Sequence, residues 1–246
     1  MSNVLTTHPA DYITVSMARL IGDGDRVFHG VASPMPAVAV QLAKKLHAKH
    51  AVYLSIAGGV DAVPRTFSHH STAGASLREG AITEFLLSDI FDLSARGALD
   101  IAFLSGAQID QYGRLNLSAI GSFDKPKVRL PGGAGSAALL PTVKKGILWK
   151  TNHDQRALVK ELDVVTAAGN TEYVITPLAI FKRTSEDGKL RVYTVFPHSS
   201  FEEIVEKTGF PVEKHEEFHT FDSITDEEFR LLEEIDESKS RYSEFK

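Results

Sequence analysis

Two glycine-containing loops of this chain offer backbone amides to a ligand. Residues 30–34 read Gly-Val-Ala-Ser-Pro, and residues 131–136 read Pro-Gly-Gly-Ala-Gly-Ser; each precedes an expected helix. Free N–H groups at the start of a helix suit a phosphate, a carboxylate or a developing oxyanion, and consecutive glycines let a backbone approach a ligand closely. A tight connection without function also explains either loop, more readily the first. Neither loop is a Walker A or G-x-G-x-x-G motif.

A third segment, residues 106–116, follows an expected strand and contains uncharged polar side chains. Gln108 and Asn116 could face a bound amide or carbonyl group, whereas Asp110 and Gly113 are typical turn residues. His215 and His219 have a spacing that suits a metal ion if they lie on a helix, but their acidic surroundings favour a surface role, and we expect no metal site. The absence of cysteine excludes disulfides and thiolate chemistry.

The overall composition is that of a soluble globular protein. The chain has 246 residues, a net charge of -5, 43% hydrophobic residues and 24% charged residues. The acidic balance argues against sequence-independent binding to nucleic acid. No run of apolar residues reaches the length of a membrane span, and the N-terminus resembles no secretion signal. We therefore expect a cytoplasmic protein with neither a membrane nor a nucleic acid as partner.

Helical and strand patterns alternate through the first 150 residues. Helices are expected at 11–21, 37–48 and 88–97, and strands at 26–31, 52–56, 100–105 and 146–149. Ser88 is the expected N-cap of the third helix. Alternation of this kind predicts an α/β fold with an open, largely parallel sheet flanked by helices.

The last third has a different pattern. Strands are expected at 173–182 and 189–196, joined by a hairpin at Asp187-Gly188. Ser200 and Thr225 each precede a glutamate by three residues, which is the spacing of a capping box and predicts two short helices. The C-terminal tail covers about residues 222–246, and its acidic segment 226–246 is expected to be partly frayed. One domain over residues 1–246 is the simplest organisation.

Taken in order, these segments resemble the second (B-type) subunits of family I coenzyme A-transferases, and those of glutaconate coenzyme A-transferase in particular. The resemblance rests on residues 30–34, 106–116, 126–129 (Pro-Lys-Val-Arg), 132–135 and 197–210. It extends over most of the chain. It implies the family's fold, an acyl-coenzyme A thioester as substrate, no permanently bound cofactor, and an A-type subunit with which the active site is shared.

The resemblance also implies a set of site residues. Gly132, Gly133 and Asn116 take catalytic roles, the two glycines as amide donors to the thioester oxyanion. The substrate-binding positions are Gly30, Val31, Ala32, Ser33, Ile56, Ala57, Gly58, Gln108, Ala134 and Gly135. Ile56 stands where the transferases carry the glutamate that attacks the thioester, and an isoleucine cannot act as a nucleophile.

The missing glutamate separates the fold from the reaction. The chain is expected to be a subunit of a heteromeric enzyme of this family that acts on an acyl-coenzyme A thioester. True transfer would need a nucleophile from elsewhere. A diverged hydrolase, carbon–carbon lyase or decarboxylase could instead use the amide loops with an acid or base from the partner. A non-catalytic partner subunit is the third possibility.

Overall fold

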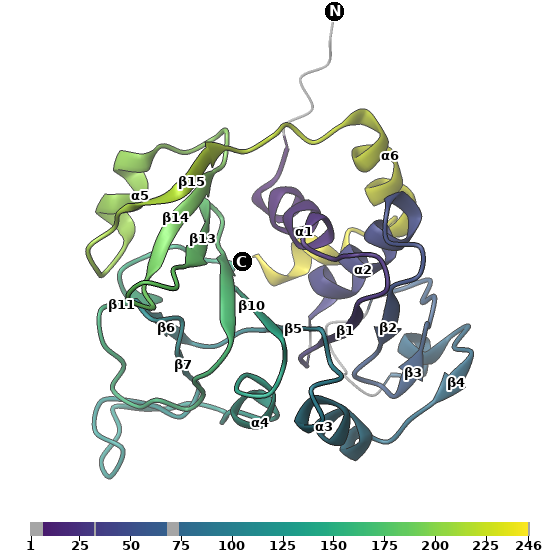
Figure 1. The fold of residues 1–246 in the computed structure, drawn as a ribbon, viewed down its shortest axis with the longest axis horizontal. Coiled ribbons are helices and arrows are strands. Elements are labelled where there is room, and N and C mark those ends of the chain that lie inside the picture. The colour runs from purple at the N-terminus through teal and green to yellow at the C-terminus, as the bar shows by residue number, and fades with distance from the viewer. Residues whose placement is uncertain (1–6, 32, 68–73, 246) are drawn as a thin grey trace, which may run out of the picture.

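A ten-stranded sheet forms the centre of the molecule (Figure 1). The computed structural model describes residues 7–31, 33–67 and 74–245. The strand order is β15-β14-β13-β12-β10-β5-β1-β2-β3-β4. Their bounds are β1 Arg26–His29, β2 Val52–Leu54, β3 Gly59–Val60, β4 Thr83–Glu84, β5 Ile101–Leu104, β10 Lys145–Trp149, β12 Thr171–Ile175, β13 Ala179–Arg183, β14 Leu190–Val195 and β15 Lys214–Thr220.

Helices and two small sheets surround this sheet. The helices are α1 Pro9–Arg19, α2 Pro34–Leu46, α3 Leu87–Ala95, α4 Ser136–Leu139, α5 Phe201–Lys207 and α6 Asp226–Ile235, with 3-10 turns η1 Ala75–Arg78 and η2 Ser240–Glu244. The small sheets contain β6 Gln108–Asp110, β7 Leu115–Asn116 and β11 Leu158–Val159 in one, and β8 Ala119–Ile120 and β9 Val128–Arg129 in the other. No helix in the described part of the chain has the length and apolar character needed to cross a membrane.

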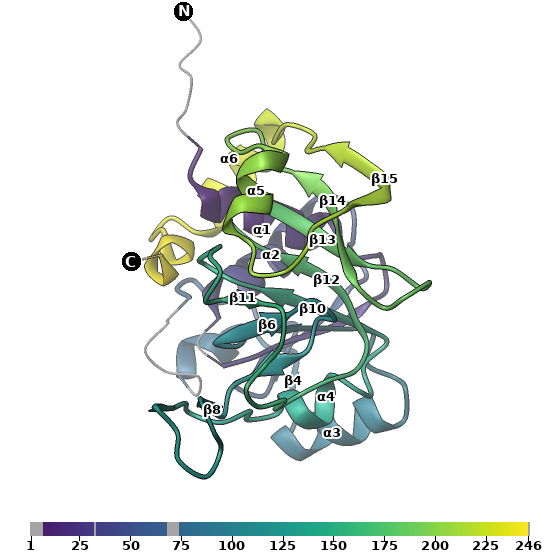
Figure 2. The ribbon, with the colours of Figure 1, turned by 90° about the vertical axis from the view of Figure 1, so that its left-hand side faces the viewer.

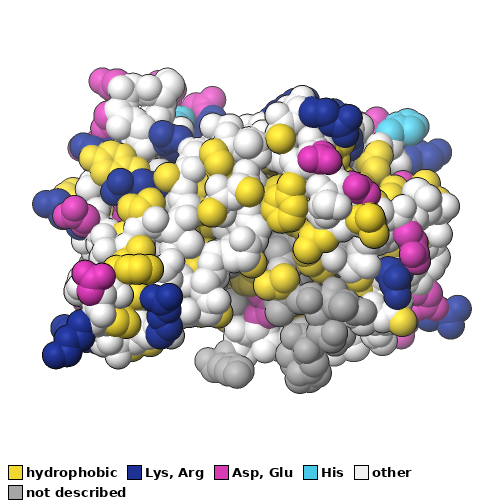
Figure 3. Space-filling view, turned by 90° about the horizontal axis from the view of Figure 1, so that it is seen from below, with side chains coloured by type: hydrophobic (Ala, Val, Ile, Leu, Met, Phe, Trp, Pro, Cys, Tyr) yellow, Lys and Arg dark blue, Asp and Glu magenta, His cyan; other side chains and the backbone are white. Residues whose placement is uncertain are grey.

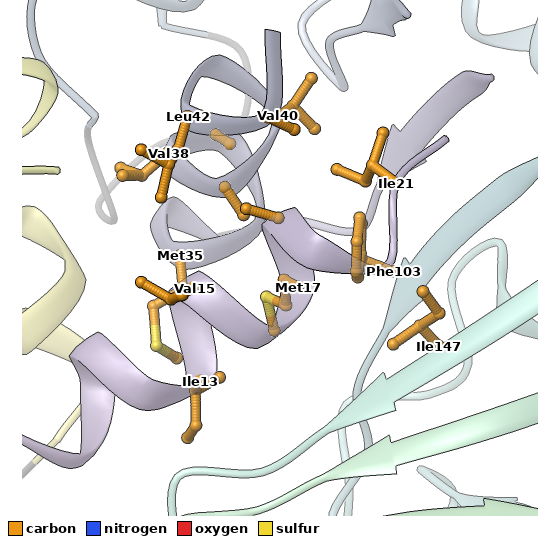
Figure 4. Packing of buried hydrophobic residues seen from close by; sticks show 14 of the residues in the cluster. Ile13, Val15, Met17, Ile21, Met35, Val38, Val40, Leu42, Phe103 and Ile147 are labelled. Carbon is orange, nitrogen blue, oxygen red and sulfur yellow. The ribbon is translucent and has the colours of Figure 1, made fainter. Parts of the chain in front are cut away.

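The five central strands, β2, β1, β5, β10 and β12, are parallel, and antiparallel strands follow on both sides. This confirms the α/β fold with a large, mostly parallel sheet. Alternate side chains of the central strands enter two different cores, because successive residues of a strand point to opposite faces. Phe103 and Ile147 pack with α1 and α2 on one face (Figure 4), whereas Leu104 and Leu148 belong to the core on the other face.

The expected strand at 173–182 is wrong as a single element. It is interrupted at Pro177 and forms two antiparallel strands, β12 and β13. The Thr176 hydroxyl oxygen accepts the N–H of Ala179 at 3.2 Å, which stabilises the reversal, and Pro177 has no N–H to continue a ladder. The hairpin at Asp187-Gly188 is confirmed between β13 and β14, with Gly188 at φ 70°.

Two of the three expected helix caps are confirmed. The hydroxyls of Ser200 and Thr225 accept the N–H groups of Glu203 and Glu228, both at 3.1 Å. Ser88 is not an N-cap, because α3 begins one residue earlier, at Leu87. Asp89 stabilises this helix start by accepting the N–H of Leu86 at 2.8 Å.

The expectation of a frayed tail is also wrong. The tail forms α6 and η2, which pack against α1 and α2 close to the C-terminus in Figure 1. Arg241 is fully buried and donates to Asp11 at 2.6 Å and to Asp236 at 3.0 Å. Asp11 lies 230 residues away in the sequence, so the charge pattern of the tail alone could not predict this pairing.

Glu244 places its carboxyl group at the start of α2. Its Oε1 accepts the N–H of Met35 at 3.3 Å, and its buried Oε2 has no partner among the described residues. Burial raises the pKa of the Glu244 carboxyl to about 8, opposed by the hydrogen bond from Met35. The backbone N–H of Met35, in the first turn of α2, is therefore bound by the chain's own C-terminal segment.

The Glu244 carboxyl is expected to make stability depend on pH between its ordinary pKa of 4.5 and its folded-state pKa of about 8. A folded-state pKa near 8 means that the folded protein binds this proton more tightly than the unfolded chain, so stability falls as pH rises toward 8. Above about pH 7 the buried amine of Lys150, which follows β10 and whose pKa is lowered to about 8, contributes with the opposite sign, because the unfolded chain binds its proton more tightly. The contribution of Glu244 is therefore measured as a difference between two proteins. Between about pH 7 and 8.5 we expect the melting temperature of the wild type to fall by about a few degrees relative to that of Glu244→Gln.

Thermal unfolding across this pH range is the measurement. Glu237→Gln, at an exposed position of the same tail, is the matched control and should follow the wild type. An unchanged pH dependence in Glu244→Gln would contradict the prediction.

Candidate active site

A cavity of about 410 Å³ opens where β1, β2 and β5 end. Its walls also include α3 and α4, which lie side by side at the bottom of Figures 1 and 2. It is lined by Phe28, Gly30, Val31, Ser33, Ile56, Leu87, Phe91, Leu104, Ser105, Gly106, Leu117, Pro131, Gly132, Gly133, Ala134, Gly135, Ser136 and Leu139. Ligand sites in open α/β sheets lie beyond the carboxyl ends of the strands. The loop after β1, Ile56 after β2 and the glycine-rich loop at 132–135 all contribute to this lining, so they meet at one edge of the sheet.

The loop after β1 is held at both ends. The N–H of Gly30 donates to the carbonyl of Phe103 at 2.9 Å, and the Ser33 hydroxyl donates to the carbonyl of Val31 at 2.9 Å. The Val31 side chain is half exposed, and its N–H has no acceptor among the described residues. Ala32, the remaining expected contact in this loop, lies outside the described residues.

The glycine-rich loop presents one of its two expected donors. The N–H of Gly132 donates to the carbonyl of Leu117 at 2.8 Å, so it is not available to a substrate oxygen. The N–H of Gly133 has no acceptor within the described ranges. Gly132 has a φ of 99°, and a Cβ on Gly133 would lie 2.7 Å from Cγ2 of Thr166. Glycine is thus required at the first position by the backbone and at the second by a close approach.

Ile56 lines the cavity with an alkyl side chain and also packs against the core beneath it. Ala57 and Gly58 follow it but do not line the cavity. Gly58 has a φ of 96°, and a Cβ there would lie 2.8 Å from the carbonyl oxygen of Phe85. These two residues shape the turn that places Ile56 in the wall.

Gln108 and Asn116 lie away from the cavity lining. The Asn116 side chain is fully buried, and its amide nitrogen donates to Oε1 of Gln108 at 2.9 Å and to the carbonyl of Ala119 at 2.7 Å. Its Oδ1 accepts the N–H of Ser118 at 3.0 Å. With its hydrogen-bonding groups engaged, Asn116 fixes the turn between β7 and β8, which precedes the glycine-rich loop.

No acidic or basic side chain is among the described residues that line the cavity. The polar side chains present are three serines, and two of them donate to backbone carbonyls: Ser33 to Val31, and Ser105 to Trp149 at 2.7 Å. A serine needs an adjacent base to become a nucleophile. The described part of this chain therefore supplies the cavity with apolar surface and backbone amides.

The sequence reasoning missed the apolar walls and one buried lysine. Phe28 and Leu104 lie near the ends of two apolar segments that the sequence predicted to be strands, so their place in the cavity wall could have been predicted. Lys150 follows β10 and donates to the carbonyls of Gly106 at 2.6 Å and Ala107 at 3.2 Å, just behind the cavity. Burial lowers the pKa of the Lys150 amine to about 8. It holds the loop after β5 and does not line the cavity itself.

His215 and His219 lie on β15 rather than on a helix, so the spacing argument for a metal ion does not apply. Both rings contact Tyr193 edge to face. Among the described residues no group of three His, Cys, Asp or Glu side chains could hold a metal ion.

The sequence is similar to those of known coenzyme A-transferases over most of its length. Residues 10–207 match the family model described as coenzyme A transferase. The chain is 28% identical over 244 residues to the B-type subunit of 3-oxoadipate CoA-transferase from Pseudomonas knackmussii, covering 92% of each. It is 25% identical over 226 residues to the B-type subunit of glutaconate CoA-transferase from Acidaminococcus fermentans, covering 81% of each.

A solved structure is similar to this chain in both sequence and fold. The crystal structure of the decarboxylase AibA/AibB contains a chain with a TM-score of 0.88 and 30% sequence identity; the match covers 96% of this chain and 98% of that one. The match of the family model to residues 10–207 leads to one conclusion. This chain belongs to the coenzyme A transferase family.

Proposed function

We propose that this chain is the B-type subunit of a heteromeric, cytoplasmic enzyme that acts on an acyl-coenzyme A thioester, with coenzyme A entering as part of the substrate. The observation that carries the proposal is the cavity at the carboxyl edge of the sheet. Its loops offer free backbone amides within apolar walls, and its described lining contains no acidic or basic side chain.

The amides fit a thioester carbonyl. When a thioester is attacked or loses a neighbouring bond, negative charge develops on its carbonyl oxygen. The N–H groups of Val31 and Gly133 have no acceptors among the described residues and border the cavity. Amide donors gain strength in a site with a low dielectric, and removing one such donor costs roughly 3 kcal/mol of transition-state stabilisation in a hydrolase.

A partner subunit completes this site in the proposal. The reaction needs an acid, a base or a nucleophile, and none is among the described lining residues. Val31 and Leu87 line the cavity and are 51% and 50% exposed. Figure 3 shows the face that carries α3 and α4: hydrophobic side chains gather across its middle, and most charged side chains lie toward its margins. An exposed apolar surface of this kind favours a protein partner.

The alkyl side chain of Ile56 excludes one step of the transferase reaction at this position. It occupies the wall where the resemblance places the attacking glutamate, so a glutamyl–coenzyme A intermediate does not form at this position. Glu79 and Glu84, the nearest glutamates in sequence, pair with Arg65 and Arg78 and do not line the cavity.

Decarboxylation is a second candidate, favoured by the apolar walls and by the 30% identity to a chain of the AibA/AibB decarboxylase. A carboxylate on the carbon next to the thioester carbonyl, or conjugated with that carbonyl, would lose its hydration in such a cavity. When the bond to it breaks, CO₂ leaves and the electron pair moves into the thioester carbonyl, which becomes an enolate held by the amides. A proton from the partner then completes the product. Release of CO₂ from a carboxylated acyl-coenzyme A would distinguish this reaction from transfer.

The first prediction of the proposed function is that this chain alone has no robust activity. Because the described cavity lining contains no titratable side chain, thioester turnover should appear only in the complex with the A-type subunit. The measurement is turnover of a panel of short acyl-coenzyme A esters by the lone chain and by the co-purified complex. Comparable rates from the lone chain would refute the need for a partner.

The second prediction is that no covalent adduct forms on this chain during turnover. Borohydride reduces a glutamyl thioester, so trapping with an acyl-coenzyme A followed by mass spectrometry of both subunits reveals a nucleophilic carboxylate. This chain should remain unmodified, and Ile56→Glu should either create transfer or abolish the native reaction. An adduct on Glu79 or Glu84 would show that the nucleophile has moved within this chain.

The third prediction tests the Gly133 amide. Gly133→Ala should lower kcat by about 10-fold or more, because its Cβ would meet Cγ2 of Thr166 at 2.7 Å and displace the donor. Thr166→Ser removes only that methyl group and keeps the oxygen that accepts the N–H of Leu117 at 2.9 Å. The double variant should therefore recover most of the activity.

Thr166→Ser by itself serves as the control and should resemble the wild type. If Gly133→Ala leaves kcat unchanged, or if Thr166→Ser fails to restore it, the assignment of the Gly133 amide is wrong.

A further inference from the structure

A buried chain of polar groups lies beneath two of the cavity loops. His29 is the last residue of β1 and is almost fully buried. Its Nδ1 lies 2.8 Å from the carbonyl oxygen of Gly30, and its Nε2 lies 2.8 Å from the hydroxyl of Tyr53. Tyr53 belongs to β2, and two residues further on the Ser55 hydroxyl accepts the N–H of Ala57 at 3.3 Å. The hydrogen bond between His29 and Tyr53 thus connects the end of β1 with β2, the strand that precedes Ile56.

The chemistry of these groups fixes the direction of the hydrogen bonds. A carbonyl oxygen only accepts, so Nδ1 of His29 must carry a proton and donate to Gly30. Burial lowers the pKa of His29 to about 4, so the ring is neutral near pH 7 and Nε2 is an acceptor. The Tyr53 hydroxyl then donates to Nε2. The roles of donor and acceptor are therefore fixed from Tyr53 through His29 to the carbonyl of Gly30.

The bond from His29 sets the orientation of the amide that follows Gly30. The carbonyl of Gly30 and the N–H of Val31 belong to one peptide plane, and no described peptide bond is cis. In a trans peptide these two groups point in opposite directions. Fixing the carbonyl toward the buried ring of His29 therefore turns the N–H of Val31 away from the core, on a segment that lines the cavity.

We propose that His29 is a positioning residue that holds the Gly30–Val31 peptide so that the Val31 N–H faces the thioester oxygen, with Tyr53 locking the ring in the required tautomer. This inference rests on the proposed function for its substrate. A donor that is fixed before the substrate arrives stabilises the transition state without a cost of reorganisation during the reaction.

Paired substitutions separate this role from simple packing. In His29→Asn the side-chain amide nitrogen can occupy the place of Nδ1 and still donate to Gly30. In His29→Gln it reaches only toward the place of Nε2. Both variants remove ring volume from the same buried site, so both should lose stability. In the complex, His29→Gln should lower kcat by about 10-fold or more with little change in KM, and His29→Asn should retain most of kcat.

His153 provides a matched control. It is also a buried histidine with both ring nitrogens bonded, to Thr176 at 2.8 Å and Thr208 at 2.9 Å, and it does not line the cavity. His153→Gln should lower the melting temperature without lowering kcat. Equal kcat losses in His29→Asn and His29→Gln, or a wild-type kcat in His29→Gln, would overturn the proposal.

The ring tautomer gives a readout that needs no substrate. In the complex with ¹⁵N-histidine in this chain, the His29 signals, identified by their absence in His29→Asn, should show a neutral ring protonated at Nδ1. A ring protonated at Nε2 would overturn the positioning role. A wild-type complex that turns over no acyl-coenzyme A would refute the proposed function, whereas the tautomer would still decide whether His29 holds the Gly30 peptide.

Discussion

Parallel hydrogen bonding on both edges of β1 is the constraint on which the rest of the structure depends. Phe28 is in register with Leu54 of β2, and Phe28 and His29 are in register with Ala102 and Phe103 of β5. The three strands therefore end at nearly the same level along the strand direction, and the loops that follow them lie side by side at one edge of the sheet. A shift of one residue would turn every side chain of β1 to the opposite face and separate the loops.

The apolar walls of the cavity have two opposed consequences. They lower the local dielectric, which strengthens the interaction of a free amide with a developing oxyanion. They also exclude the charged side chains that could move a proton, because an unpaired charge is costly to bury. In the function proposed above, the backbone of this chain therefore stabilises the developing charge, and the partner subunit supplies the reactive group. Ile56 strengthens this division, since it extends the apolar wall.

The C-terminal segment packs against the two helices that flank the loop after β1 in the sequence, α1 and α2. Arg241 is paired with Asp11 of α1 and Asp236 of the tail, and Glu244 accepts from Met35 at the start of α2. Breaking one partner of a buried ion pair leaves an uncompensated charge, which is strongly destabilising. These contacts join the C-terminal segment to α1 and α2, and α2 directly follows the loop after β1.

The sequence by itself determined the α/β pattern, the caps at Ser200 and Thr225, the hairpin at Gly188 and the loops that meet at the cavity. Each depends on residues close together in the chain, so spacing and local propensity were enough. The tertiary structure alone decided which amides remain free. The carbonyl of Leu117 takes the Gly132 N–H, and Gln108 takes the Asn116 amide. It also decided that the acidic tail folds, through an ion pair between Arg241 and Asp11. A backbone donor or a charge is satisfied by whichever acceptor packing brings near it, and that neighbour is set by the whole fold.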